Sequence, residues 1–153
     1  MGQSYSAVPS SEPINVSEFS GRWYQISRNQ NPFQDPNAKN AYSDFTLNDD
    51  GTIKTLHSET LPTGSVNNME GIGYVDATGR NYRSETGDLM TIYEYMPDIG
   101  FSIIGDPNKG YFWIMSRDRY PEAYNYHQAL NQLKKHGLCF EGLIVTYQDN
   151  SNL

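Results

Sequence analysis

The segment that most constrains the fold lies near the N-terminus and reads Phe19-Ser20-Gly21-Arg22-Trp23-Tyr24-Gln25-Ile26-Ser27-Arg28. A second segment, far along the chain, reads Gly110-Tyr111-Phe112-Trp113-Ile114-Met115-Ser116-Arg117. Both are rich in aromatic and β-branched residues, which favour strands. We therefore expect one strand over Arg22–Arg28 and another over Gly110–Arg117.

Six further strand candidates lie between these two segments, separated by turn-forming residues. Asp49-Asp50-Gly51 divides the first two of them, which is a hairpin signal. The six candidates are Ala41–Leu47, Thr52–Glu59, Met69–Asp76, Arg80–Thr86, Leu89–Met96 and Ile99–Gly105. Eight short strands at regular spacing indicate a barrel or a sandwich.

One segment does not follow the strand pattern. From Pro121 to His136 the apolar residues follow a helical period, which predicts an amphipathic helix. Pro121 suits its first turn and Gly137 suits the position just after its end. The apolar stripe of this helix comprises Ala123, Tyr126, Leu130 and Leu133. A short last strand is expected over Leu143–Tyr147.

Size and charge limit the classes of function. The 153 residues fit one domain, expected over residues 14–153 after a polar, flexible arm of residues 1–13. The net charge of −7 argues against nucleic acid as a partner, because phosphates demand a basic face. It also argues against a purely electrostatic hold on an anionic membrane.

The number of cysteines and the N-terminal sequence indicate the cellular compartment in which the protein is expected. Cys139 is the single cysteine, so no disulfide can form within the chain. The segment Met1–Ser20 has neither the basic nor the apolar region of a classical signal peptide. We therefore expect a cytoplasmic protein, or one on the cytoplasmic side of a membrane.

The first six residues, Met1-Gly2-Gln3-Ser4-Tyr5-Ser6, match the N-myristoylation pattern, with Gly2 as the acylated residue. A single acyl chain gives only weak membrane association. Gly2 is thus a candidate lipidation site, and the oligomeric state stays open.

Two motifs together resemble the signature of the lipocalin family. Gly21 and Trp23 form its Gly-x-Trp motif, and the run from Gly110 to Arg117 resembles its eighth strand. Asp98 is the one residue of Pro97-Asp98-Ile99 that matches the family's Thr-Asp-Tyr. The resemblance extends from Ile14 to Tyr147 and is strongest to the bacterial-type lipocalin and apolipoprotein D branch. It implies an all-β fold, an eight-stranded antiparallel up-and-down β-barrel with one C-terminal helix and a short final strand.

The signature residues have a physical role in such a barrel. An eight-stranded barrel is just wide enough to be filled by side chains or to enclose one small ligand, so its narrow end needs a plug. Trp23 can lie across that end with the Arg117 guanidinium stacked on its ring. Gly21 allows the chain to enter the strand tightly against the barrel floor. We assign Gly21, Trp23, Asp98 and Arg117 to the structure and not to the ligand site.

Side-chain alternation predicts which residues face the interior. Counting from Trp23 gives Gln25 and Ser27, and counting from Arg117 gives Met115, Trp113 and Tyr111. The resemblance adds three inward residues of the second strand. Phe33 lies in the long loop Arg28–Asn40, which covers the open end in this family. Glu94, if it points inward, would mark the polar end of a ligand. The candidate ligand-binding residues are Gln25, Ser27, Phe33, Ser43, Phe45, Leu47, Glu94, Tyr111, Trp113 and Met115.

The resemblance implies binding or transport of a small hydrophobic ligand, such as a fatty acid or a lysophospholipid. One alternative is an interaction module whose barrel is filled by its own side chains. A second is a lipocalin-type isomerase, although Cys139 is expected outside the barrel. We expect no enzyme activity, no catalytic residue and no cofactor, and no metal because His57, His127 and His136 lack ligand spacing.

Overall fold

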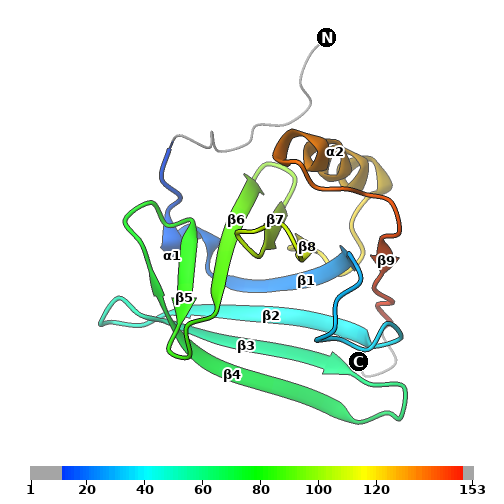
Figure 1. The fold of residues 1–153 in the computed structure, drawn as a ribbon, viewed down its shortest axis with the longest axis horizontal. Coiled ribbons are helices and arrows are strands. Elements are labelled where there is room, and N and C mark those ends of the chain that lie inside the picture. The colour runs from blue at the N-terminus through cyan, green and yellow to red at the C-terminus, as the bar shows by residue number, and fades with distance from the viewer. Residues whose placement is uncertain (1–11, 150–153) are drawn as a thin grey trace.

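Antiparallel pairing joins eight strands into a closed ring in the computed structural model, which describes residues 12–149 (Figure 1). Each strand pairs with the next, and β1 pairs with both β8 and β2, which closes the ring. The strands are β1 (Gly21–Arg28), β2 (Lys39–Leu47), β3 (Ile53–Thr60), β4 (Val66–Val75), β5 (Asn81–Ser84), β6 (Leu89–Met96), β7 (Phe101–Gly105) and β8 (Phe112–Ser116). All eight predicted strands and the predicted barrel are confirmed.

The remaining elements lie outside the ring. They are α1 (Val16–Phe19), α2 (Ala123–Leu133), the 3₁₀ helix η1 (Lys134–His136) and β9 (Ile144–Val145). Gly137 ends the helical segment with φ +72°, as predicted. The helix was expected to begin at Pro121, but α2 begins two residues later, at Ala123, because Glu122 is its N-cap. The buried stripe of α2 includes Ala129 in place of Ala123, which is exposed.

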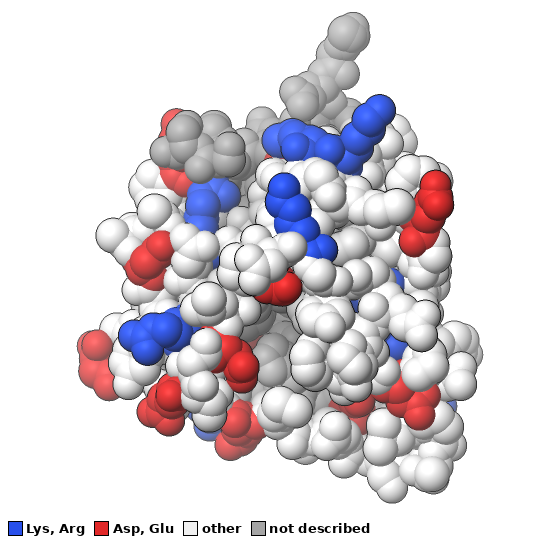
Figure 2. Space-filling view, viewed as in Figure 1, with Lys and Arg blue, Asp and Glu red and all other residues white. Residues whose placement is uncertain are grey.

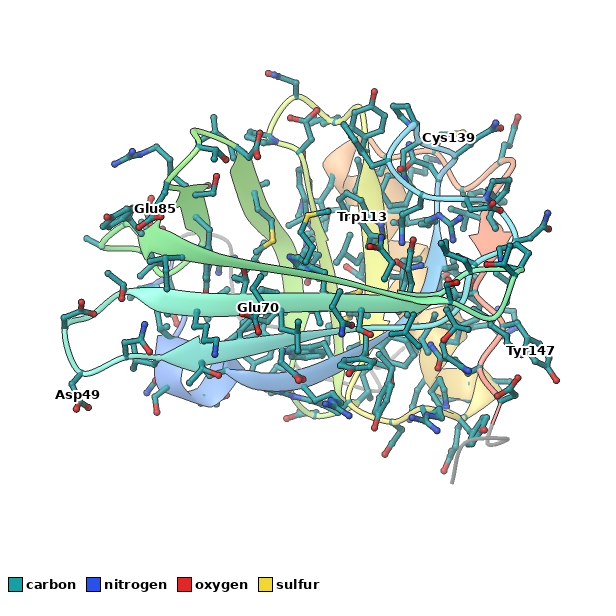
Figure 3. The ribbon with its side chains drawn as sticks, turned by 90° about the horizontal axis from the view of Figure 1, so that it is seen from below. Asp49, Glu70, Glu85, Trp113, Cys139 and Tyr147 are labelled. Atoms are coloured by element: carbon teal, nitrogen blue, oxygen red, sulfur yellow. The ribbon has the colours of Figure 1, made fainter. Side chains whose placement is uncertain are left out.

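The up-and-down order gives the barrel two distinct ends. At the closed end lie α1 and the turns 48–52, 76–80 and 97–100. At the open end lie the loop 29–38 and the turns 61–65, 85–88 and 106–111. Figure 3 shows β2, β3 and β4 side by side, with Asp49 at the closed end and Tyr147 at the opposite end.

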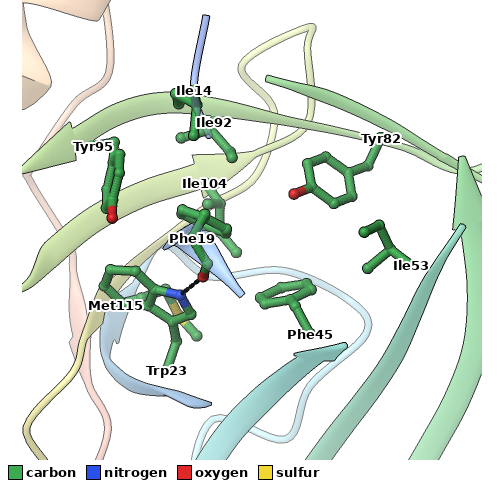
Figure 4. Close-up of a cluster of buried hydrophobic side chains, with 10 residues drawn as sticks. All are labelled: Ile14, Phe19, Trp23, Phe45, Ile53, Tyr82, Ile92, Tyr95, Ile104 and Met115. Carbon is green, nitrogen blue, oxygen red and sulfur yellow. Dashed lines mark hydrogen bonds between the residues drawn. The ribbon is translucent and has the colours of Figure 1, made fainter. Parts of the chain in front are cut away.

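Two apolar clusters pack on the two faces of the wall. The interior cluster draws residues from α1 and most strands and fills the closed end (Figure 4). The outer cluster packs α2 against the outside of β1, β6, β7 and β8. The interior cluster comprises Ile14, Phe19, Trp23, Phe45, Ile53, Tyr82, Ile92, Tyr95, Ile104 and Met115. The outer cluster comprises Ile26, Met96, Phe101, Ile103, Phe112, Ile114, Ala129, Leu133 and Leu138.

A bulge in β1 reverses the alternation of its side chains. The pairing of β1 with β8 shifts between Gln25 and Ser27, so that Ile26 is an extra residue. Ser27 then pairs with Ile114, a residue of the outer cluster, and its hydroxyl contacts α2. The predicted inward orientation of Ser27 is therefore wrong, because the bulge turns it to the outer face.

A second bulge, in β6, turns the Glu94 side chain to the outer face. The register with β7 shifts between Ile92 and Glu94, which places Glu94 opposite Ile103 on the outer face. There Glu94 is 2% exposed and lies 2.5 Å from His136 Nε2 and 3.2 Å from Lys135 Nζ. The basic side chains over the C-terminal end of α2 are visible at the top of Figure 2. The inward orientation considered for Glu94 is wrong, and this carboxylate fixes η1 to the wall instead.

No helix in the described part of the chain is long and apolar enough to cross a bilayer.

Candidate functional site

The closed end is plugged as the signature residues predict. Trp23 is fully buried, and its Nε1 donates a hydrogen bond to the Phe19 carbonyl over 2.8 Å (Figure 4). The Arg117 guanidinium carbon lies 3.9 Å from the centroid of the Trp23 ring. Arg117 also donates to the carbonyl oxygens of Arg22, Glu18 and Phe19. The floor is therefore a stacked pair that covers the barrel and caps three carbonyls.

Glycine is required at the floor. Gly21 has φ +104°, and a Cβ there would lie 3.3 Å from Arg117 Nη1. Asp98 lies in the β6–β7 turn at the same end. Of the predicted arm 1–13, residues 1–11 lie outside the described range, and the Glu12 carbonyl accepts a hydrogen bond from Arg80 Nε over 3.0 Å.

Part of the inner wall, on β3 and β4 towards the open end, is accessible. Directly opposite residues on antiparallel strands share a face, so Ser43, His57 and Met69 all face inward with Trp23. Met69 is nevertheless 63% exposed, and His57 is also exposed. At Gly71, an added Cβ would meet only Thr55 Oγ1, at 3.5 Å. The interior therefore stays open along this wall.

His57 has a polar setting inside this wall. Its Nδ1 lies 2.7 Å from Ser43 Oγ, and burial lowers the pKa of the imidazole below its ordinary value. The ring has exposed area although protein surrounds it, because that area faces the barrel interior. The combination favours a neutral imidazole within reach of a bound molecule.

The other predicted inward residues divide between the two ends. Phe45 and Met115 are buried in the interior cluster, below the open part of the barrel. Leu47 shares their face but lies at the closed end of β2, where it is 41% exposed. Trp113 is half-buried on the inner face near the open end. Contact of these residues with a ligand stays a prediction.

One side chain of the loop 29–38 joins three points of the open end. Gln34 accepts a hydrogen bond from Trp113 Nε1 over 2.7 Å. Its amide nitrogen donates to Gln25 Oε1 over 3.1 Å and to Glu59 Oε1 over 3.0 Å. Gln25 in turn donates to Thr146 Oγ1 over 2.7 Å. A polar network, which we call the mouth network, therefore spans β1, β3, β8 and the loop.

Phe33 does not take part in this network. Its side chain is 70% exposed and packs edge-on against Tyr111, with ring centroids 5.2 Å apart. Both residues lie on segments at the open end, the loop 29–38 and the β7–β8 turn. Contact of Phe33 with a ligand stays a prediction, and in this structure its neighbour Gln34 is the residue that reaches the barrel wall.

Arg28 is a buried residue that the sequence did not reveal. The β1 bulge places it opposite Trp113, on the inner face, where it is 1% exposed. Its Nη2 donates to the Asp35 carbonyl over 2.8 Å. Burial lowers the pKa of the guanidinium, and the charges of Glu59 and Asp35 oppose this shift. The alternation of a regular strand would have turned Arg28 outward.

The segment after α2 completes the wall at the open end. There β1 and β2 no longer pair, and residues 144–149 lie between them. Thr146 N donates to the Ile26 carbonyl, and Gln148 Nε2 donates to the carbonyls of Gln25 and Ala41. This short segment is therefore part of the barrel mouth.

Two further sequence candidates lie away from the interior or outside the description. Cys139 is exposed just after η1, so the chain's single thiol is not in the barrel, as predicted. Gly2 lies outside the described residues. Within residues 12–149 no group of three His, Cys, Asp or Glu side chains is arranged to hold a metal.

Comparisons with known proteins agree with this architecture. Residues 14–148 match the model of the Lipocalin-like domain family. Temperature-induced lipocalin-1 of Arabidopsis thaliana is 30% identical, over 90% of this chain and 81% of that protein. Apolipoprotein D of Oryctolagus cuniculus is 27% identical, over 93% of this chain and 81% of that protein.

Solved structures show the same fold at lower identity. The cockroach allergen Per a 4 superposes with a TM-score of 0.74 at 14% identity, over 93% of this chain and 94% of that one. Insecticyanin of Manduca sexta superposes with a TM-score of 0.73 at 16% identity, over 92% of this chain and 83% of that one. The family match, the plugged floor and the closed eight-stranded ring together establish that this chain belongs to the lipocalin family.

Proposed function

We propose that this lipocalin binds one small, elongated apolar molecule, such as a fatty acid or a lysophospholipid, in the open-end half of its barrel. The main observation in support is that inward-facing residues of β3 and β4 remain accessible. His57 and Met69 point into the barrel and are exposed, while Gly71, closer to the floor, contributes no side chain of its own to the wall. A barrel filled by its own side chains would bury this wall.

The lining suits a ligand of mixed character. The interior cluster offers an apolar floor for a hydrocarbon chain, and the mouth network offers hydrogen-bonding groups at the other end. Burying ~300 Å² of ligand at ~25 cal/mol per Å² gives roughly 7–8 kcal/mol before the costs of association. We therefore expect dissociation constants in the micromolar range.

Tryptophan emission provides a direct assay. Trp113 lies on the inner wall near the mouth, whereas Trp23 is fully buried at the floor. Titration with oleate should change the emission, and Trp113→Phe should remove most of that change. Unchanged emission in both proteins, with no bound lipid by native mass spectrometry, would favour the filled-barrel interaction module.

A cavity-filling pair of variants tests the location. Gly71→Leu projects a side chain into the open interior, where the added Cβ meets only Thr55. Its neighbour Glu70 is exposed on the outer face of β4, so Glu70→Leu adds the same side chain to the outside. We expect Gly71→Leu to weaken oleate binding at least about 10-fold and Glu70→Leu to leave it unchanged. Equal binding by both variants would place the ligand elsewhere.

A further inference from the structure

Arg28 lies inside the barrel at the open end. It is the last residue of β1, and its register partner on β8 is Trp113, whose ring faces the interior and contacts the loop through Gln34. The side chain is 1% exposed. A full positive charge is therefore held beneath the loop 29–38, because a guanidinium stays protonated in proteins.

Most of the donors of this guanidinium have no partner. Nη2 donates to the Asp35 carbonyl, but within residues 12–149 neither Nε nor Nη1 has a hydrogen-bond partner. These two nitrogens carry three of the five N–H groups. Arg117, by contrast, uses both terminal nitrogens on three carbonyls, and Arg22 makes a two-point contact with Asp44. Anchoring the loop through Asp35 uses Nη2, so the three N–H groups on Nε and Nη1 are not explained by the fold.

The charges of Glu59 and Asp35 act on Arg28, but neither carboxylate accepts a hydrogen bond from Nε or Nη1. Glu59 faces the same interior and is 8% exposed, and its Oε1 accepts a hydrogen bond from Gln34. Its charge acts on Arg28 at a distance. Buried charged donors are normally paired, and a bound anion would supply the missing partner.

We propose that Arg28 binds the anionic oxygens of the ligand's polar head, so that the preferred ligand is an amphiphile with a carboxylate or phosphate head. This inference rests on the proposed function. The head lies beneath the loop 29–38 and the tail extends along the open wall towards Met69 and His57. Because Arg28 is covered, Gln34 and the loop move aside to admit the head and then close over it.

Matched neutral and anionic probes test the inference. Wild-type protein should bind oleate at least about 10-fold more tightly than methyl oleate, because the ester keeps the chain and loses the charge. Arg28→Met should lower the affinity for oleate to that for methyl oleate, so that the difference between the two probes disappears. Oleyl phosphate and oleyl alcohol form a second pair, and the larger of the two anionic preferences identifies the head group.

Two further variants separate this role from a general effect of charge. Arg83→Met removes the same charge from the exposed outer face of β5 and should leave the preference intact. Glu59→Gln removes the competing anion from the interior and should increase the preference for oleate, a result that does not depend on whether Arg28→Met folds. Equal affinity of wild-type protein for oleate and methyl oleate overturns the role of Arg28 alone. Binding of neither probe overturns the proposed function as well.

Discussion

Tyr126 donates a hydrogen bond from its hydroxyl to Ser27 Oγ over 2.8 Å, which ties α2 to the outer face of β1 at the bulge. Ser27 is fully buried, so its hydroxyl has no access to water as a substitute partner. The pair is thus a direct test of the reversed orientation of Ser27.

We expect Tyr126→Phe to lower the free energy of unfolding by about 1 kcal/mol. Ser27→Ala should cost a similar amount, and the double variant should cost less than the sum, since both changes remove the same bond. Urea denaturation of the four proteins gives the coupling. Strict additivity would mean that the hydroxyls do not interact.

Trp23→Ala should lower the free energy of unfolding by about 3–5 kcal/mol, because it empties the floor and removes the ring beneath Arg117. Trp113→Phe, at the half-buried mouth, is the matched aromatic change and should cost less than about 1.5 kcal/mol. Thermal denaturation compares the two variants. A loss below about 1 kcal/mol for Trp23→Ala would contradict its role as the plug.

Glu94 should make stability fall in acid. Burial raises the pKa of this carboxyl, but hydrogen bonds from His136 and Lys135 and their charges outweigh it, so the net pKa lies below the ordinary value of 4.5. The unfolded chain therefore takes up the proton first as the pH drops, and the stabilisation present above pH 4.5 is lost as the pH falls through the lower, folded-state pKa. Glu94→Gln should flatten this part of the curve of unfolding free energy against pH, whereas Glu70→Gln, on the exposed face of β4, should not.

His57 should be harder to protonate in the folded protein than in the unfolded chain. Burial lowers the pKa of its imidazole below 6.5, so acid again favours the unfolded chain, here as the pH falls from 6.5 towards the folded-state value. NMR titration of the three histidines measures this directly, and His57→Asn identifies the signal. A His57 signal that titrates at or above pH 6.5 would contradict the inward-facing position inside the barrel.

Cys139→Ser should leave oleate affinity and the emission change unaltered, because the thiol is exposed outside the barrel. Fluorescence titration of the variant beside wild-type protein is sufficient. Loss of binding, or of any turnover, together with the thiol would revive the isomerase alternative.

The strands could be predicted because turn residues at regular spacing mark them. That pattern alone is compatible with a barrel or a sandwich, and the resemblance of Gly21, Trp23 and Arg117 to the lipocalin signature implies the closed ring and its floor. The mouth could not be predicted in the same way. One extra residue at Ile26 turns Ser27 outward and Arg28 inward. Counting every second residue from Trp23 assumes a regular strand and therefore misses this bulge. Gln34 reaches the wall only through the folded path of the loop, and nothing in the local sequence distinguishes it from the other polar residues there.

The segment 144–149 makes the open end of the barrel depend on residues that follow α2. Thr146 and Gln148 bond to β1 and β2 where these two strands no longer pair with each other. A chain cut after residue 140 keeps all eight strands of the ring in its sequence and loses these bonds. A truncation or replacement at the C-terminal side of α2 therefore alters the mouth without changing any strand of the ring.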